Sequence, residues 1–287
     1  MASHKAINNS VIVIDKPPGH ASHEITTFVK KITHASRAGH AGTLDPDVSG
    51  VLPVALGRAT KLLRYIAGKD KTYVGIIKFR NIMKKEEIEE LFSRFTGEIV
   101  QTPPEVSAVR KRPRKRHVHH LKLIEVKGRL ALFEAKVAAG TYIRTLCEDI
   151  GKRCGGARLE ELRRIAVGKT TEKESFGIYD VVDAMWFYEN KKDVTLLQKM
   201  LRAPESLIDL PRVFVKESAL ESVLSGAQVM IPAIENMEDA KPGQRVSMYC
   251  GEKFIGVGVA QVSKDELKKK KGLAVKLERV HKPSEMG

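Results

Sequence analysis

Hydrophobic spacing in the N-terminal part of the chain predicts short strands and helices in mixed order. The β-branched run 11–14 is typical of a buried strand, and residues 71–79 predict a second one. Ser22 can cap a helix after the first strand, because a serine oxygen accepts from the N–H groups of a first turn. Residues 59–66 predict a short helix that stops at a glycine. The clearest helix has apolar residues at i, i+3, i+4 and i+7 and is closed by Gly97; they are Ile88, Leu91, Phe92 and Phe95.

The central part of the chain predicts a hairpin and further helices, without regular βαβ alternation. Residues 121–126 and 130–137 have strand character on either side of Lys127-Gly128, which is turn chemistry. Three helical segments are predicted after the hairpin: one starting at Thr141, one over 159–165 and one over most of 179–201. Strands and helices in this irregular order indicate an α+β fold and not a doubly wound parallel sheet.

A domain boundary is predicted in the stretch 204–211, between two prolines, which gives a first domain of residues 1–208 and a second of 209–287. The second domain has a predicted strand at 213–215, a helix at 219–224 and then several short strands. Glycines at turn or bulge positions separate these strands. The pattern predicts a small, mainly β module.

The chain is strongly basic, which favours a polyanionic partner. Its 287 residues include 50 Lys and Arg against 35 Asp and Glu, giving a formal net charge of +15. Nucleic acids and anionic membrane surfaces both fit such a charge. No apolar run approaches the ~20 residues that span a bilayer, and residues 1–10 lack the apolar core of a secretory signal. We therefore expect an intracellular nucleic-acid-binding protein with no membrane partner.

Cofactor and metal motifs are not evident in the sequence. The three cysteines form no Cys-x-x-Cys pair, which predicts idle thiols in a reducing compartment. Histidines at 20 and 23, and at 117–120, lack partners at zinc spacing. Gly168-Lys169-Thr170 resembles the end of a phosphate-binding loop, but the first glycine of that motif is missing. We expect neither a metal nor a cofactor.

One carboxylate lies on a predicted loop, in the segment Gly39-His40-Ala41-Gly42-Thr43-Leu44-Asp45-Pro46. Pro46 disfavours α-helical dihedrals at Asp45, and Gly39 and Gly42 permit close backbone approach or positive φ. A catalytic carboxylate offered to a bulky substrate needs such a setting. An Asx-type turn beside a proline explains the same residues, so the segment alone leaves both interpretations open.

Two further residues fit RNA chemistry, and each has an ordinary structural alternative. Tyr73 on the strand 71–79 can stack on an extruded base, although a strand tyrosine is more often a core residue. Arg144 can form a bidentate pair with a carboxylate and keep it ionised, although most arginines at a helix start are solvated. The basic run 110–116 either grips an RNA strand or is a solvated loop.

Several segments in a fixed order resemble one family. They are Lys16-Pro17-Pro18-Gly19-His20-Ala21-Ser22-His23-Glu24, residues 39–54, Lys71-x-Tyr73, Pro103-Pro104-x-x-Ser107-Ala108-Val109, residues 140–146 and Glu161-Leu162-Arg163-Arg164. Together they resemble the TruB-type pseudouridine synthases, and specifically their dyskerin-like branch. Ser225-Gly226-Ala227 and residues 272–275 resemble a PUA domain, an RNA-binding pseudobarrel. The resemblance implies a catalytic domain with a mixed, largely antiparallel sheet and flanking helices, followed by this pseudobarrel.

The resemblance also implies a reaction in which uracil leaves C1′ of ribose, turns and rejoins through C5, without a cofactor. Asp45 is then the expected catalytic carboxylate, either adding to C1′ or taking a proton from C2′. Arg144 is expected to pair with Asp45, Tyr73 to stack on the flipped base, and Lys16 to support the motif loops. The expected substrate contacts are Tyr142, Leu162, His40, Gly42, Thr43, Arg110, Lys111, Arg112 and Arg114.

Partners follow from the dyskerin-like branch. The expected particle contains a box H/ACA guide RNA, substrate rRNA or tRNA, a small zinc-ribbon-like subunit, a Gar-type β-barrel subunit and a kink-turn-binding protein. The lack of a long lysine-rich tail favours the archaeal, cytoplasmic form over a nucleolar one. Asp47 departs from the family, because many relatives carry a lysine there. Two alternatives stay open, namely a stand-alone synthase acting on the tRNA T-loop and a non-catalytic RNA-binding scaffold.

Overall fold

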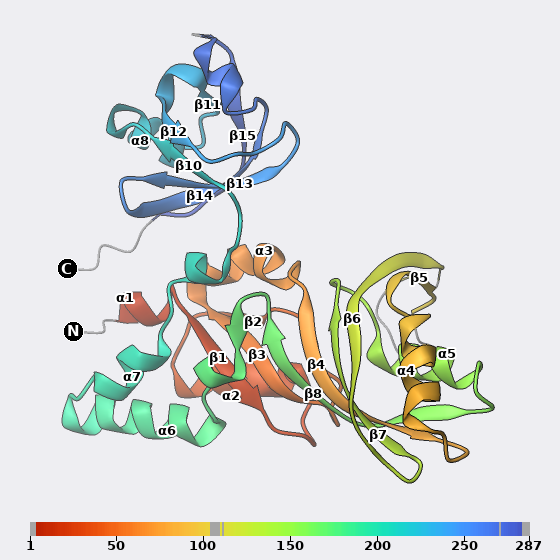
Figure 1. Ribbon diagram of the computed structural model, residues 1–287. Coiled ribbons are helices and arrows are strands. Elements are labelled where there is room, and N and C mark those ends of the chain that lie inside the picture. The colour runs from red at the N-terminus through yellow and green to blue at the C-terminus, as the bar shows by residue number, and fades with distance from the viewer. Residues whose placement is uncertain (1–3, 104–109, 111, 270, 283–287) are drawn as a thin grey trace. The chain divides into compact units, whose positions relative to one another are not determined.

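The computed structural model describes residues 4–103, 110, 112–269 and 271–282. The chain forms two compact units, Met1–Arg202 and Ala203–Gly287, and each is built around its own sheet (Figure 1). The residues that the sequence assigns to chemistry all belong to the first unit.

The first unit contains a nine-stranded sheet with the main order β1-β3-β8-β4-β7-β6-β5, while β2 pairs with β3 and β9 with β8. Among the described strands of this sheet, β3 and β8 alone run parallel. The predicted mixed, largely antiparallel sheet is therefore confirmed. The strands are β1 (Val11–Lys16), β2 (Ala38–His40), β3 (Ser49–Leu56), β4 (Lys71–Phe79), β5 (Gly97–Gln101), β6 (Arg114–Lys127), β7 (Leu130–Val137), β8 (Ala157–Val167) and β9 (Thr170–Thr171).

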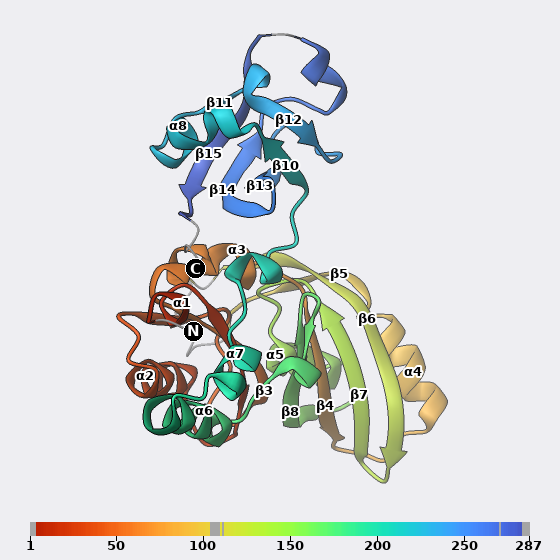
Figure 2. The same ribbon diagram turned by 90° about the vertical axis from the view of Figure 1, so that its left-hand side faces the viewer.

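Helices cover this sheet in two groups, each with its own core. The first core lies near strands β1 and β3 and contains Ile14 and Leu52, which are enclosed by helices α2, α6 and α7. Figure 2 shows α2 beside α6. Near β4, β6 and β7, α4 and α5 enclose Phe92 and Phe133. The helices are α1 (His4–Ile7), α2 (Ser22–Ile32), a 3₁₀ segment (Gly57–Leu62) continuing into α3 (Leu63–Ala67), α4 (Lys85–Ser93), α5 (Ile143–Gly151), α6 (Ile178–Trp186), a π-helical turn (Phe187–Lys191) and α7 (Thr195–Met200).

The helix predicted over 159–165 is wrong, because these residues belong to strand β8. Its pairing with β4 contains two bulges, which leave Glu160 and Ile165 without a residue opposite. Each bulge adds one residue to β8, so positions 159, 162, 164 and 167 face alternate residues of β4 and lie on one face. The spacing of three across each bulge mimics a helical period, which explains the error.

Two smaller predictions also need correction. The basic run was expected to be a loop over 110–116, but Arg114 already begins β6 and pairs with Gln101 of β5. The helix expected to start at Thr141 begins at Ile143 instead. The Thr141 hydroxyl donates to the Ala138 carbonyl at 2.8 Å and so closes the turn that precedes α5.

The second unit is mainly β, as predicted. Its six-stranded sheet has the order β11-β15-β14-β13-β10-β12, in which β10 and β13 are parallel. Val213, Val246 and Met248 are fully buried in its core. Its elements are β10 (Arg212–Val215), α8 (Leu220–Leu224), β11 (Val229–Met230), β12 (Ile234–Met237), β13 (Arg245–Cys250), β14 (Lys253–Ala260) and β15 (Leu273–Val280).

Candidate active site

The Asp45 segment is a loop between β2 and β3, and its glycines are used as predicted. Gly42 has φ +92°, and a side chain at Gly39 would lie 2.6 Å from Leu63 Cδ1. The Val48 N–H donates to the Asp45 carbonyl at 3.1 Å, which closes a turn after Asp45. The Asp45 side chain is 60% exposed. The loop therefore presents its carboxylate to solvent on a constrained backbone.

The fully buried side chain of Lys16 supports the loop through hydrogen bonds to backbone carbonyls. Lys16 Nζ donates to the carbonyls of Pro17, His20 and Pro46 at 2.8, 2.7 and 3.0 Å. The Gly19 N–H donates to the same Pro46 carbonyl at 2.8 Å. Burial lowers the pKa of Lys16, and the nearby Asp47 and Asp45 carboxylates oppose that shift. The expected supporting role of Lys16 is confirmed.

Ser22 anchors the loop from helix α2, and its predicted role as a helix cap is wrong. Ala21 precedes the helix, and its N–H is bound by the Glu24 carboxylate at 2.8 Å. The buried Ser22 hydroxyl instead donates to the Leu44 carbonyl and accepts from the Leu44 N–H, both at 2.8 Å. It thus fixes the residue immediately before Asp45.

Arg144 reaches the loop from the first turn of α5 and contacts two carboxylates with one nitrogen. Its Nη2 lies 3.5 Å from Asp45 Oδ2 and 3.0 Å from Asp47 Oδ2. The hydrogen bond to Asp47 is the main reason that the pKa of Arg144 is raised, and Asp45 contributes less. The expected contact with Asp45 is present, but the predicted bidentate geometry is replaced by sharing between Asp45 and Asp47.

Tyr73 lies in the core behind the loop. It is 8% exposed and shares a hydrophobic cluster with Leu44, Val48 and Ile143, which brings β4, the Asp45 loop and the start of α5 together. Tyr73 therefore occupies a core position, as the structural alternative in the sequence analysis expected. Stacking of its ring on a substrate base stays a prediction.

Two buried cationic side chains, Arg164 and Lys71, lie next to Gly42. Arg164 is 1% exposed and donates to the carbonyls of Val51 at 2.8 Å and Gly42 at 2.9 Å. Burial lowers the pKa of Arg164, while Tyr73 opposes this shift through its hydroxyl. Lys71 Nζ donates to the carbonyls of Ala67 and Lys69, both at 2.6 Å, and burial lowers the pKa of Lys71 to about 8. The positive charge beneath the loop favours an anion at its surface.

Tyr142 and Leu162 are both half-buried near the hydrophobic cluster that contains Tyr73. Tyr142 precedes α5, and the buried Gln101 of β5 holds its backbone in both directions. The Tyr142 N–H donates to Gln101 Oε1 at 3.0 Å, and Gln101 Nε2 donates to the Tyr142 carbonyl at 3.1 Å. Leu162 lies on β8, opposite Gly75, and packs against the Tyr73 cluster.

His40 links helix α2 to the exposed part of the loop. Its Nδ1 lies 3.1 Å from the Thr26 hydroxyl, and its Nε2 lies 3.3 Å from the Thr43 hydroxyl. Burial lowers the pKa of His40 and so favours the neutral ring. His40, at the end of β2, is therefore tied to Thr43, two residues before Asp45.

The basic run is only partly described. Arg110 and Arg112 are exposed, Lys111 lies outside the described residues, and Arg114 is half-buried in β6. Arg114 Nε is buried and has no hydrogen-bond partner among the described residues. From Arg114 onward the run belongs to β6, the strand next to the edge strand β5.

Three residues that position the site were missed as such by the sequence analysis: Ser22, Gln101 and Arg164. Each acts on backbone groups that are distant in sequence, so no local pattern reveals the contact. Within the described residues, no group of three or more His, Cys, Asp or Glu side chains could hold a metal ion. None of the described helices is both long and apolar enough to cross a bilayer.

Family models match three consecutive parts of the chain. The TruB family pseudouridylate synthase N-terminal domain matches residues 30–143, the tRNA pseudouridylate synthase B C-terminal domain 144–209, and the PUA domain 211–281. A probable tRNA pseudouridine synthase B from Pyrobaculum islandicum is 41% identical over 96% of this chain and 85% of its own length. The Pyrococcus furiosus protein of the same name is 38% identical over 96% and 83%.

Solved structures agree with the sequence relatives. A Cbf5-Nop10-Gar1 complex contains a chain with a TM-score of 0.91 and 37% identity, covering 96% of this chain and 85% of that one. An H/ACA RNP bound to a substrate RNA containing 2′-deoxyuridine contains one with a TM-score of 0.90 and 36% identity, covering 97% and 86%. Fold, site and relatives together define an RNA pseudouridine synthase, an isomerase. The chain belongs to the TruB family of these enzymes and carries a PUA domain.

Proposed function

We propose that this chain converts uridine to pseudouridine in rRNA, and also in tRNA, under the direction of a box H/ACA guide RNA. Support comes from its similarity, over almost its whole length, to chains in a Cbf5-Nop10-Gar1 complex and in a substrate-bound H/ACA RNP. The partners would be the guide RNA, a zinc-ribbon-like subunit, a Gar-type β-barrel subunit and a kink-turn-binding protein. Residues 1–208 would form the catalytic domain and 209–287 the PUA domain, and the enzyme would act inside the cell, where these RNAs are found.

Asp45 is the catalytic carboxylate in this proposal. The observation that carries it is the exposed Asp45 side chain, which faces Arg144 across a loop held by Lys16, Ser22 and Arg164. A group that must meet one atom of a large substrate gains from such fixed placement, because the geometry is organised before binding. A non-catalytic scaffold has no physical need for this arrangement.

The chemistry is a rearrangement without net change in composition. The bond between N1 of uracil and C1′ breaks, the base turns, and a bond forms between C5 and C1′. C5 then loses its proton and N1 gains one. Asp45, ionised and held by Arg144, would either add to C1′ or remove a proton from C2′.

The remaining residues would bind the substrate. Tyr73 would stack on the flipped base, which requires the base to reach the small exposed part of its ring. Tyr142 and Leu162 would line the pocket, and His40, Gly42 and Thr43 would contact the strand beside the target. Arg110, Lys111, Arg112 and Arg114 would attract RNA phosphates.

A second candidate is a synthase that modifies tRNA without a guide. The curated relatives named tRNA pseudouridine synthase B favour this candidate. Both candidates use the same chemistry at Asp45, so guide dependence is what separates them.

The separating experiment uses rRNA and tRNA transcripts labelled with tritium at C5 of uridine. Isomerisation releases that tritium to water, because C5 exchanges its hydrogen for C1′. We expect rRNA release only when guide RNA and partner subunits are added. Release from tRNA by the chain alone, without any release from guided rRNA, would favour the second candidate. No release from either RNA in any combination would contradict both.

A further inference from the structure

The two cations that hold the backbone on either side of Asp45 lie on one face of the sheet. Lys16 of β1 and Arg164 of β8 are both paired with Gly50 of β3, one from each side. Residues opposite each other in a sheet project to the same face, so the two cations flank Gly50. Lys16 bonds a carbonyl just after Asp45, and Arg164 bonds one before it. The placement of the loop therefore depends on the spacing between β1 and β8.

An arginine on the opposite face joins the same two strands. Arg163 precedes Arg164 on β8, and Asp15 precedes Lys16 on β1, so both side chains project away from the face that carries the loop. Arg163 Nη1 and Nη2 donate to Asp15 Oδ1 and Oδ2, each at 2.9 Å. A bidentate contact of this kind fixes the orientation of both groups as well as their distance. It spans β3, which lies between β1 and β8.

The third nitrogen of Arg163 binds a second carboxylate. Nε donates to Glu172 Oε2 at 2.8 Å, in the 3₁₀ turn that follows β9. The chain then returns to β1, where the Phe176 N–H donates to the Val13 carbonyl and the Asp15 N–H donates to the Phe176 carbonyl, both at 2.9 Å. The hydrogen bonds to Asp15 and then Glu172 raise the pKa of Arg163. Arg163 thus ties β8 both to β1 and to the segment that pairs with it.

The direct pairing between β3 and β8 is short, which gives this contact its importance. The two strands share the residue pairs Ser49–Arg163 and Gly50–Arg164, whereas β1 and β3 are paired from Val11 to Lys16. A junction of two residue pairs offers few backbone hydrogen bonds to resist sliding. The bridge from Arg163 to Asp15 reinforces it at the same level of the sheet.

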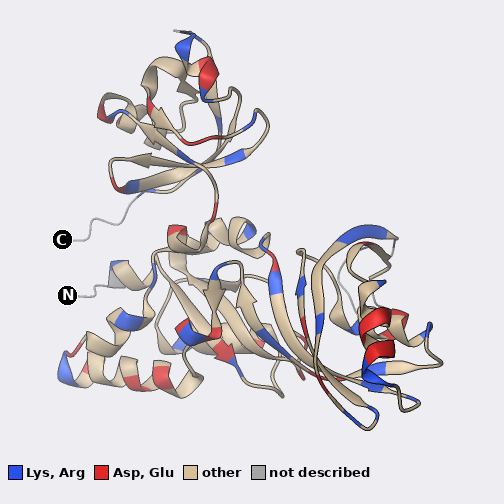
Figure 3. Ribbon diagram, viewed as in Figure 1, with Lys and Arg blue, Asp and Glu red and all other residues tan. Residues whose placement is uncertain are grey.

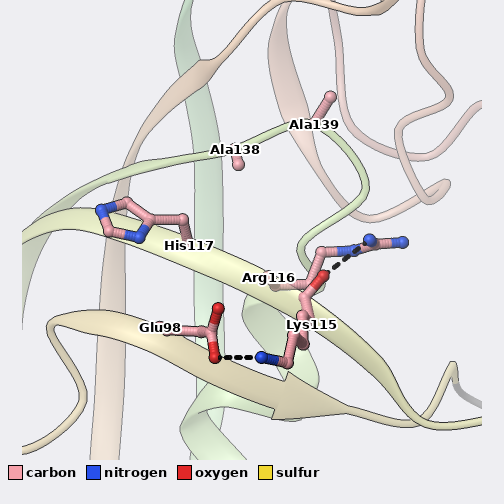
Figure 4. Close-up of a pocket in the computed structure, with 6 residues that line it drawn as sticks. All are labelled: Glu98, Lys115, Arg116, His117, Ala138 and Ala139. Atoms are coloured by element: carbon pink, nitrogen blue, oxygen red, sulfur yellow. Dashed lines mark hydrogen bonds and ion pairs between the residues drawn. The ribbon is translucent and has the colours of Figure 1, made fainter.

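An ordinary cross-strand ion pair of the same unit shows the difference. Lys115 of β6 and Glu98 of β5 lie on adjacent strands and make one contact of 2.9 Å (Figure 4). Their side chains are 75% and 60% exposed, against 36% and 37% for Arg163 and Asp15. Figure 3 shows acidic and basic residues on many strands and helices of this unit. What distinguishes the Arg163 contact is therefore its reach across an intervening strand.

We propose that Arg163 is a positioning residue for the isomerisation, because its bidentate contact with Asp15 fixes the spacing of β1 and β8 and so keeps Asp45 aligned. The inference rests on the proposed catalytic role of Asp45. Arg163 acts through Lys16 and Arg164, which would shift with their strands and carry the loop backbone along. A displacement of about 1 Å at a reacting group can lower a rate about 100-fold.

The test compares wild type with Arg163→Met by single-turnover tritium release, with the RNA and subunits that support wild-type turnover. The rate at saturating RNA should fall about 10–100-fold. RNA affinity should stay within about twofold of wild type, because no phosphate contact is removed. The melting temperature should fall by no more than about 4 °C, since ion pairs this exposed contribute little stability. Arg158→Met is the matched control: it removes an arginine that pairs with Glu160 within β8, at 3.1 Å, and should leave the rate unchanged.

Asp15→Asn provides a second variant that keeps the side-chain shape and should also slow turnover. The double variant Asp15→Asn/Arg163→Met should be no slower than Arg163→Met alone, because both substitutions break one contact. An Arg163→Met rate equal to that of Arg158→Met would overturn the proposal, as would effects that multiply in the double variant or a loss of affinity in place of rate. These outcomes leave the proposed function standing, whereas full turnover by Asp45→Asn would remove the proposed role of Asp45 itself.

Discussion

At the scale of single residues, Arg144 is the unusual part of the site. One guanidinium nitrogen serves two carboxylates, and the contact with Asp47, at 3.0 Å, is shorter than the contact with Asp45, at 3.5 Å. A lysine at position 47 could not accept that hydrogen bond. By distance to Arg144 alone, Asp47 would be chosen as the catalytic carboxylate. The position in the loop segment instead favours Asp45. Substitution of each carboxylate separates these two assignments.

Lys71 predicts a pH-dependent contribution to stability. Burial lowers its pKa from the ordinary 10.5 to about 8 in the folded chain. The unfolded chain therefore binds the proton more tightly, so the buried charge destabilises the fold below about pH 8, and this penalty is relieved as pH rises towards 10.5. After allowance for partial hydration, the effect is about 1–3 kcal/mol.

Urea unfolding of wild type and Lys71→Met at pH 7 and pH 10 measures this contribution. The free energy of unfolding of wild type should rise by that amount relative to the variant between the two pH values. Lys127→Met, which removes an exposed lysine, is the control and should track wild type. An equal difference between wild type and Lys71→Met at both pH values would refute the assignment.

At the scale of elements, helix α2 holds the catalytic loop through its first residue. Ser22→Ala should remove both hydrogen bonds to Leu44 and leave two buried backbone groups unpaired. We expect a loss of about 1–3 kcal/mol in the free energy of unfolding. Turnover should fall about 10–100-fold at temperatures where the variant is folded, since small displacements of a reacting group are costly.

Ser93→Ala is a matched control for this substitution. Its hydroxyl also donates to a carbonyl, that of Glu90 in the same helix, but Ser93 lies on the exposed side of α4 and far from the loop in sequence. Urea unfolding and single-turnover rates should both stay near wild type. If Ser22→Ala behaves like Ser93→Ala, α2 does not position Asp45.

Strands and helices were predicted correctly where the residues of one face keep a regular spacing along the sequence. Strand β4 has the predicted bounds of 71–79, and the apolar face of α4 contains the predicted Ile88, Leu91 and Phe92. The prediction for β8 failed because each of its two bulges lengthens the spacing along one face from two residues to three. Bulges depend on the partner strand, so the pattern of β8 alone cannot reveal them.

The site was predictable to the extent that its chemistry resides in side chains of a characteristic type. Residue type and context made Asp45 and Arg144 candidates, the resemblance to TruB-type synthases assigned their roles, and the structure brings them into contact. Ser22, Gln101 and Arg164 act by bonding backbone groups of distant segments. Such contacts exist only once the sheet has formed, so a linear pattern contains no signal for them.

At the scale of the whole molecule, the mixed sheet assembles the site from distant parts of the chain. Asp45 and Arg144 are 99 residues apart in sequence, and they meet because β3 and β8 join the two halves of the sheet. The parallel pairing of β3 with β8 needs a glycine at position 50, since a side chain there would lie 2.1 Å from the Arg164 carbonyl oxygen. The charge of +15 then supplies attraction for RNA over the whole chain.

The most direct test of the central claim compares Asp45→Asn with Asp47→Asn in the assembled enzyme, by tritium release from C5-labelled RNA. Both variants remove one negative charge beside Arg144, so each is the electrostatic control for the other. We predict that Asp45→Asn lowers the single-turnover rate by about 10³-fold or more with RNA affinity nearly intact, and that Asp47→Asn stays within about tenfold of wild type. Turnover by Asp45→Asn within tenfold of wild type, or loss of turnover in Asp47→Asn alone, would contradict the account.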